Sequence, residues 1–147
     1  MVRPRFLTGL AFALLTITAA GCRPPRSAPD LASPPYPADL HTANSVDVQV
    51  FRENQALQIV NTTAMSYEDF TLWLNQRYAR RVKSLLAGAT VRLSLWEFYD
   101  ELGEGLTPGG FWRTERATPI RMCEIQVDDE TPLIGLITIR AEDPVQE

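Results

Sequence analysis

Apolar and polar residues alternate with a period of two positions along much of the chain after residue 45. Val46, Val48 and Val50 alternate with polar neighbours, and Leu57 and Ile59 repeat the pattern after a short polar turn. Because successive side chains of a β-strand point to opposite faces, this alternation indicates strands with one buried face. The two stretches are predicted to form a hairpin. Similar patterns predict further strands over residues 89–95, 120–127 and 132–140.

The stretch from Ser66 to Gly88 fits two different structures. As a helix, it would begin at the N-cap Ser66, gather its apolar residues near one face and end at Gly88. As strands, the alternating residues 70–74 would be followed by a turn at 75–76 and a returning strand. Local propensity favours the helix. An α+β fold with a helix at about residues 67–87 is therefore the alternative to an all-β fold.

Several short motifs follow one another in the middle of the chain. They are Asn61-Thr62, Tyr67, Leu74-Asn75, Tyr78, Leu86-Ala87-Gly88 and Phe98-x-Asp100-x-x-Gly103. Their order resembles a domain of bacterial extracytoplasmic proteins, a small β-sandwich with no assigned activity. The usual pattern has asparagine–glycine where this chain has Asn75-Gln76. The resemblance covers residues 57–112 and implies strands over residues 68–86.

With these strands included, the count is about seven, the number in an immunoglobulin-like sandwich. We therefore predict an all-β fold, a small immunoglobulin-like antiparallel sandwich over residues 46–141. Three of the last six residues, 142–147, are acidic, and this stretch is predicted to be a disordered tail.

An apolar run at the N-terminus predicts export. Arg3 and Arg5 precede about fifteen mostly apolar residues, which end in Ala19-Ala20-Gly21-Cys22. Basic residues, a short apolar run and small residues are the parts of a secretory signal. The final cysteine makes the stretch resemble a bacterial lipoprotein signal. This resemblance implies that residues 1–21 are a signal peptide and that Cys22 is lipidated with fatty acids such as palmitate.

Such a protein would be a membrane-anchored lipoprotein of the bacterial cell envelope, facing the periplasm or the exterior. An ordinary cleaved signal and a retained membrane anchor are the alternatives. A spanning helix needs about 20 apolar residues, and this run is shorter.

The segment after Cys22 is rich in proline. Six of the eleven prolines fall between residues 23 and 45. Proline removes backbone donors and favours extended conformations, so residues 22–45 are predicted to be a semi-rigid tether outside the core. At about 3.1 Å per residue, the tether would reach roughly 70 Å. A ligand for a proline-recognition domain is the alternative.

The composition argues against several functional classes. Without Arg3 and Arg5 the chain carries 12 basic and 18 acidic residues, which argues against nucleic-acid binding. The single histidine, His41, lies in the predicted tether, which argues against Ser-His-Asp and Cys-His sites and against zinc. No metal or other cofactor is expected. With Cys22 lipidated, Cys123 has no disulfide partner and is predicted to face the core, with an exposed, cross-linking thiol as the alternative.

Two charged clusters are open to more than one interpretation. The acidic cluster comprises Glu97, Asp100, Glu101 and Glu104. Its carboxylates would suit calcium or a paired-carboxylate glycosidase, but we favour a solvated turn. The basic cluster comprises Arg77, Arg80, Arg81 and Lys83. It would attract anionic surface polymers or lipids, but we favour a solvated strand whose charges oppose aggregation.

Aromatic residues provide the main candidate binding surface. Trp73 and Trp96 are both expected to point away from the leucines of their strands. Exposed rings would stack on a sugar or a protein partner, whereas buried rings would extend the core. We therefore predict a non-enzymatic envelope protein that mediates protein or glycan interaction. A carbohydrate or small-molecule binding module that uses surface aromatics is the alternative, and an enzyme is a third possibility.

Overall fold

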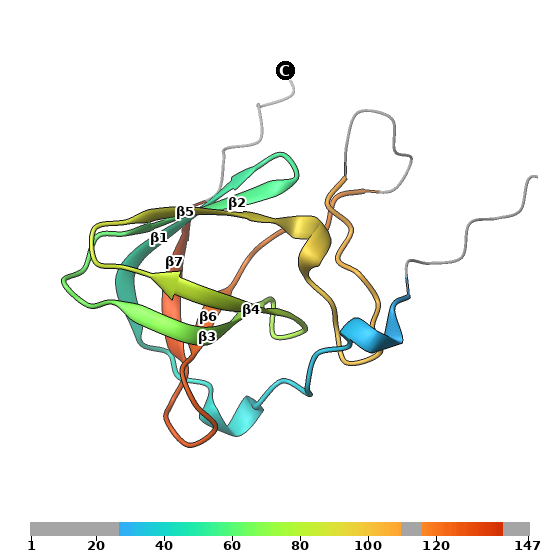
Figure 1. Ribbon diagram of the computed structural model, residues 1–147, viewed down its shortest axis with the longest axis horizontal. Helices are drawn as coiled ribbons and strands as arrows, with labels where there is room; N and C mark the ends of the chain where they lie inside the picture. Colours follow the sequence, from blue (N-terminus) through green and yellow to red (C-terminus); the bar gives the residue numbers. More distant parts are fainter. Residues whose placement is uncertain (1–26, 110–115, 140–147) are drawn as a thin grey trace, which may run out of the picture.

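The computed structural model describes residues 27–109 and 116–139, and this part of the chain is mostly β (Figure 1). The all-β prediction is confirmed, and two strands replace the alternative helix at 67–87. The strands are β1 (Ser45–Glu53), β2 (Ala56–Asn61), β3 (Tyr67–Leu74), β4 (Tyr78–Leu85), β5 (Thr90–Ser94), β6 (Cys123–Gln126) and β7 (Ile134–Ile139). Short 3-10 helices are η1 (Pro29–Leu31), η2 (Ala38–Leu40) and η3 (Leu95–Glu97).

The strands form one seven-stranded sheet in the order β4-β3-β6-β7-β1-β2-β5. Neighbours are antiparallel except β1 and β7, which are parallel and change register between Val46 and Gln49. The prediction of a purely antiparallel arrangement is therefore wrong for this pair. Alternation identifies the buried face of a strand but not the direction of its neighbour. The parallel pair joins the first strand to the last, so no turn in the sequence indicates that the two strands are neighbours.

The sheet curls until its two edge strands approach each other, which makes the domain nearly barrel-like (Figure 1). After β5 the chain passes through η3, and Tyr99 then forms an antiparallel bridge with Ala79 of β4. An ion pair between Arg80 of β4 and Glu97 of η3 spans the same gap. The residues after β5 therefore cover part of the β4 edge and bring the loop around Asp100 to the start of β4.

The alternating apolar residues fill the inside of the curled sheet. The residues with no exposed surface include Val48, Val50, Leu57, Ile59, Phe70, Leu72, Leu74 and Ile125. Cys123 packs among them and is 1% exposed. The prediction that Cys123 faces the core is therefore confirmed. The same burial raises the pKa of its thiol to about 12.

Residues 27–44, called here the N-terminal segment, lie against the rest of the domain. At its start, Ser27 bridges Glu104, and the Ala28 N–H donates to the Gly103 carbonyl oxygen at 2.8 Å. Near its end, the Leu133 N–H donates to the Leu40 carbonyl oxygen at 2.8 Å. The described part of the predicted tether therefore belongs to the folded domain. Proline content indicates extended backbone, but it does not reveal that apolar side chains between the prolines have a surface to pack on.

Among the described residues, no helix has the length and apolar character needed to cross a bilayer. The predicted signal peptide (residues 1–21), Cys22 and the predicted tail (residues 142–147) lie outside the described residues. Export, lipidation and disorder of the tail therefore remain predictions.

Candidate functional site

The turn between β3 and β4 has an uncommon backbone. Leu74 pairs with Tyr78, and the Arg77 N–H donates to the Leu74 carbonyl oxygen at 3.1 Å. The two central residues, Asn75 and Gln76, have φ angles of 52° and 58°. Asparagine adopts this left-handed conformation readily, but glutamine does so at a cost, and such turns usually have glycine at the second position. Gln76 is therefore strained where glycine would be relaxed.

The Asn75 side chain is used within the fold. Its Nδ2 donates to the Pro119 carbonyl oxygen at 2.7 Å, and its Oδ1 accepts from the N–H groups of Arg121 and Met122 at 2.8 and 3.3 Å. These bonds attach the chain before β6 to the turn. Asn75 thus has a clear structural role at its left-handed position.

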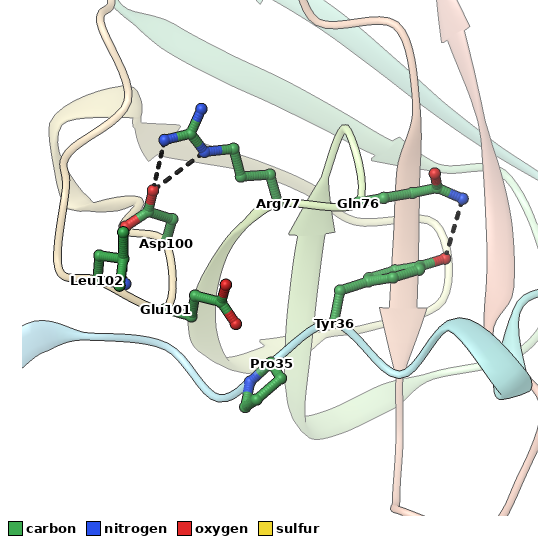
Figure 2. Close-up of a pocket in the computed structure, with 7 residues that line it drawn as sticks. All are labelled: Pro35, Tyr36, Gln76, Arg77, Asp100, Glu101 and Leu102. Atoms are coloured by element: carbon green, nitrogen blue, oxygen red, sulfur yellow. Dashed lines mark hydrogen bonds and ion pairs between the residues drawn. The ribbon is translucent and has the colours of Figure 1, made fainter.

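Gln76 lies in the wall of a cleft of about 400 Å³ beside the turn (Figure 2). Its Nε2 donates a long hydrogen bond, 3.4 Å, to the Tyr36 hydroxyl of the N-terminal segment. The cleft combines apolar surface with charged and amide groups. Its lining residues are Pro35, Tyr36, Gln76, Arg77, Asp100, Glu101 and Leu102.

A second cleft, of about 440 Å³, lies on the other side of the turn. It is lined by Asn75, Gln76, Arg77, Tyr78, Thr118, Pro119, Arg121 and Met122. Gln76 and Arg77 line both clefts and form the ridge between them. Arg77 also lies over the Tyr78 ring, 5.0 Å from its centroid.

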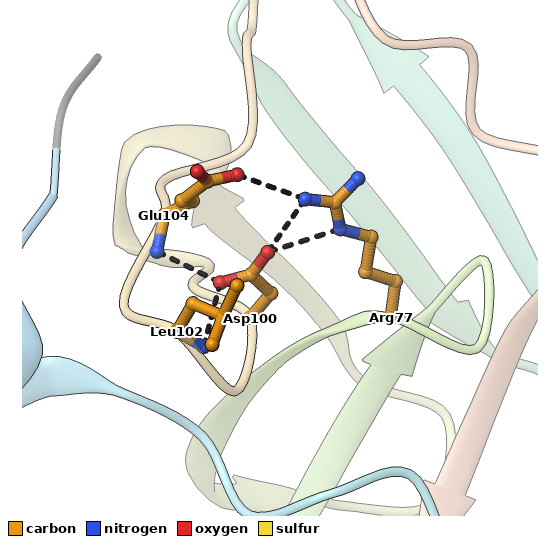
Figure 3. Close-up of polar contacts among 4 residues, drawn as sticks. All are labelled: Arg77, Asp100, Leu102 and Glu104. Carbon is orange, nitrogen blue, oxygen red and sulfur yellow. Dashed lines mark hydrogen bonds and ion pairs between the residues drawn. The ribbon is translucent and has the colours of Figure 1, made fainter.

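Asp100 fixes the position of the Arg77 side chain (Figure 3). Its Oδ2 accepts from Nε and Nη2 of Arg77 at 3.0 and 2.7 Å, and its Oδ1 accepts from the N–H groups of Leu102 and Glu104 at 3.0 and 2.8 Å. Glu104 adds a second carboxylate 2.9 Å from Arg77 Nη2. Asp100 is 2% exposed, so this charge is satisfied by the protein rather than by water.

These contacts set the charge state of Asp100. Burial by itself would raise its pKa. The hydrogen bonds from Arg77 and from the backbone N–H groups of Glu104 and Leu102 outweigh burial and hold the pKa below its ordinary value. Asp100 is therefore a structural carboxylate, negatively charged at neutral pH.

The geometry gives each member of the Phe98-x-Asp100-x-x-Gly103 motif a structural role. The Phe98 side chain is fully buried in the core. Gly103 has a φ of 74°, and a Cβ there would lie 2.6 Å from the Ala28 carbonyl oxygen. The motif thus closes a tight loop against which the N-terminal segment packs.

The charged clusters inferred from the sequence pair with each other. Arg77 binds Asp100 and Glu104, whereas Arg80 binds Glu97. Arg81 and Lys83 are exposed on β4. Three of the four acids of the calcium alternative are therefore paired with guanidinium groups. Within the described residues no group of three His, Cys, Asp or Glu side chains is placed to hold a metal ion.

A second buried carboxylate was not anticipated from the sequence. Glu124 of β6 is 1% exposed, and its Oε1 lies 2.6 Å from Nδ1 of His41. The Tyr36 hydroxyl donates to the other oxygen, Oε2, at 2.8 Å. Burial and then the bond to Glu124 raise the pKa of Tyr36 above its ordinary value. The three side chains attach residues 36–41 to β6 and lie next to the first cleft through Tyr36.

Trp73 lies beside this group and is covered by the N-terminal segment. As predicted, it points away from the main core, but it packs with Ala79, Leu133, Tyr36 and Leu40 and is 1% exposed. Its ring meets the Tyr36 ring edge to face at 5.3 Å, and its Nε1 donates to Gln126 Oε1 at 2.7 Å. Trp73 is therefore not available as an exposed stacking surface in this arrangement.

Trp96 has different surroundings. It belongs to η3, is half-buried, and its Nε1 donates to Gln55 Oε1 of the β1–β2 turn at 3.2 Å. The structure thus places the two candidate tryptophans in separate environments, Trp73 beneath the N-terminal segment and Trp96 beside the β1–β2 turn. They do not form the shared platform that the sequence suggested.

Comparison with known protein families, with curated proteins and with solved structures finds no match to this chain.

Proposed function

We propose that this chain is a lipid-anchored, non-enzymatic protein of the bacterial envelope, and that it binds a protein partner at the β3–β4 turn. Removal of residues 1–21 would leave Cys22 as the lipidated first residue, with the domain facing the periplasm or the exterior. Gln76 and Arg77 form the centre of the contact surface, flanked by the two clefts.

The strained backbone of Gln76 is the observation that carries this proposal. A side chain at its φ of 58° costs about 1 kcal/mol relative to glycine. Its hydrogen bond to Tyr36 is long, so the fold recovers little of this cost. Strained residues that contribute little to stability are concentrated at functional sites. The position of the side chain between two clefts supports a role in binding.

The lining of the first cleft favours a protein over a sugar as the partner. Tyr36, Pro35 and Leu102 supply apolar surface, and Arg77 and Glu101 supply charges of both signs. Protein interfaces combine aromatic and arginine side chains in this way, whereas sugars are usually bound on flat, exposed rings. Binding of a carbohydrate or small molecule is the alternative, and it would depend on Trp96, because Trp73 is covered.

A photo-crosslinking amino acid at position 76 tests the proposed contact in intact cells. We expect one discrete adduct from position 76 and none from position 83, because Lys83 is also exposed but lies farther along β4, outside the cleft linings. Equal adducts from both positions, or none from position 76, would contradict a binding site at this turn.

The lipid anchor has its own test. Metabolic labelling with a fatty-acid analogue should label the native chain and the variant Cys123→Ala, but not Cys22→Ser. Cys123 is the matched control because it is the other cysteine of the chain and is buried. Label retained by Cys22→Ser would contradict lipidation at this residue.

We also infer that the curled sheet is a sandwich of immunoglobulin type. The strand order supports this inference, because β4-β3-β6-β7-β1 and β1-β2-β5 would be its two layers. The register shift of β1 between Val46 and Gln49 supplies the bend that a strand shared by two layers requires.

A further inference from the structure

Two exposed leucines lie on neighbouring segments at one end of the molecule. Leu31 of η1 is 55% exposed and Leu102 is 66% exposed. Their segments run side by side, because Ala28 N–H donates to the Gly103 carbonyl oxygen and Ser33 N–H to the Asp100 carbonyl oxygen, at 2.8 and 2.9 Å (Figure 1). Leu31 and Leu102 thus belong to one surface, made of η1 and residues 100–104.

This surface begins close to the proposed anchor. Ser27, which bridges Glu104, follows Cys22 by five residues. A fully extended chain of that length spans at most about 18 Å. With the N-terminal segment packed on the domain, the reach from the lipid to the first described residue is far shorter than the tether of residues 22–45 suggested. A lipid on Cys22 would therefore hold η1 and residues 100–104 next to the bilayer.

We propose that the surface of η1 and residues 100–104 faces the membrane, with Leu31 and Leu102 in contact with the headgroup region. This inference rests on the lipidation in the proposed function. Leucine side chains gain by leaving water at the bilayer interface. Asp30 and Glu101 are acidic neighbours, so the matching surface is zwitterionic lipid rather than anionic lipid.

The orientation also restricts the partner. Glu101 and Leu102 line the first cleft as well as belonging to the membrane-facing surface. A protein bound in that cleft would therefore lie against the bilayer, which favours a partner that is itself bound to the membrane.

Hydrogen exchange on vesicles tests the surface directly. The chain beginning at Cys22 is coupled to a maleimide lipid and mixed with vesicles of phosphatidylcholine and phosphatidylethanolamine. Coupling at Cys22 is selective because Cys123 is buried. We expect the amides of residues 28–33 and 100–105 to exchange at least about threefold more slowly than in the uncoupled chain with the same vesicles.

A variant with Leu31→Asp and Leu102→Asp should lose this protection, whereas the control Leu86→Asp should keep it. Leu86 is also 50% exposed, but it follows the last residue of β4. The loop of residues 100–104 lies at the other end of β4, because Tyr99 pairs with Ala79 near the start of that strand. Protection that survives in the double variant, or that covers residues 62–66 and 86–89 instead, would contradict the proposed orientation. The comparison of the coupled with the uncoupled native chain shows whether the bilayer protects residues 28–33 and 100–105, and it needs no variant.

The two proposals fail in different ways. Because the lipid is attached chemically, an unprotected surface would contradict the membrane-facing orientation even if cells lipidate Cys22. Absence of the fatty-acid label in cells would instead contradict the proposed anchor and leave the vesicle result unchanged.

Discussion

Asp100 and Glu124 are both buried carboxylates next to the N-terminal segment, but they are satisfied in different ways. Asp100 receives its hydrogen bonds from Arg77 and from two N–H groups of its own loop, all within 23 positions along the chain. The described partners of the Glu124 carboxylate are Tyr36 and His41, which lie 88 and 83 positions away.

The difference separates two kinds of attachment. The hydrogen bonds to the Asp100 carboxylate come from Arg77 and from its own loop rather than from the N-terminal segment, and the loop presents the Gly103 carbonyl oxygen to Ala28. Glu124 acquires Tyr36 and His41 only once the segment has packed. A buried carboxylate without partners is costly, so the segment and the Glu124 side of β6 must fold together. At one end the N-terminal segment therefore packs on a loop that is held by its own hydrogen bonds, and at the other end it completes a buried polar group.

The largest effect is expected from removing the packing at the Glu124 end. Trp73→Ala should lower the free energy of unfolding by about 3–5 kcal/mol, the range for a large buried aromatic cut to alanine. Trp96→Ala is the control, and its loss should be smaller because Trp96 is only half-buried. Urea unfolding of both variants gives the comparison. A loss below about 1 kcal/mol for Trp73→Ala would mean that its ring is not covered in solution.

Removal of the Asp100 carboxylate should have the next largest effect on stability. Asp100→Ala leaves two N–H groups and the Arg77 guanidinium without their acceptor, and we expect a loss of about 2–3 kcal/mol in the free energy of unfolding. This loss is small for a broken buried ion pair, because the Arg77 side chain is half-exposed. Glu101→Ala, on the same loop but exposed, is the control and should change stability little. Equal losses in the two variants would contradict the role of Asp100.

The dependence of stability on acid pH gives a second test of the role of Asp100. The folded pKa of Asp100 lies below its ordinary value of 3.8, so its stabilising contribution is complete above about pH 4 and is lost as the pH falls through the folded pKa. Urea unfolding between pH 7 and pH 2.5 should therefore show a less steep acid decline in Asp100→Asn than in the native chain. Asp128, whose pKa is also lowered, titrates in both proteins and cancels in the comparison. Identical slopes would exclude a lowered pKa at Asp100.

A smaller effect is expected at the hydroxyl that joins the segment to Glu124. Tyr36→Phe keeps the ring on Trp73 but removes the donor to Glu124, and we expect a loss of about 1–2 kcal/mol in the free energy of unfolding. Tyr36→Ala, which removes ring and hydroxyl, should cost more. If Tyr36→Phe is neutral while Tyr36→Ala is not, the segment is held by apolar packing and Glu124 does not depend on the hydroxyl.

The same contrast explains what the sequence could predict. Period-two alternation identified β1, β2, β5, β6 and β7, because it reports a local geometry. For β3 and β4 the alternation left a helix open, and the prediction of strands rested on the resemblance to the extracytoplasmic domain. The Asp100 motif was visible because its residues lie close together along the chain. The parallel pairing of β1 with β7 and the partners of Glu124 depend on contacts between distant residues, and neither leaves a pattern in a short window.

The candidate site was predictable in part. Asn75-Gln76 was noted only as a departure from the asparagine–glycine of the pattern that the chain resembles, and it was not predicted to be a binding site. Its place in the candidate site became visible only with the backbone angle and the two clefts. Trp73 was assigned to the correct face of its strand. Its cover was missed because the proline-rich segment was taken to be free of the domain, although the segment carries Tyr36 between two prolines and Leu40 shortly after the last one.

The smallest predicted effect is also the one of opposite sign. Gln76→Gly should raise the free energy of unfolding by up to about 1 kcal/mol, because glycine adopts the φ of 58° without strain. Asn75→Gly at the neighbouring left-handed position should lower it, because the Asn75 side chain bonds to residues 119, 121 and 122. Denaturant midpoints of the two variants show whether each side chain stabilises the fold, as expected for Asn75, or destabilises it, as expected for Gln76. If Gln76→Gly is destabilising by as much as Asn75→Gly, the glutamine is structural, and its backbone strain does not mark a binding surface.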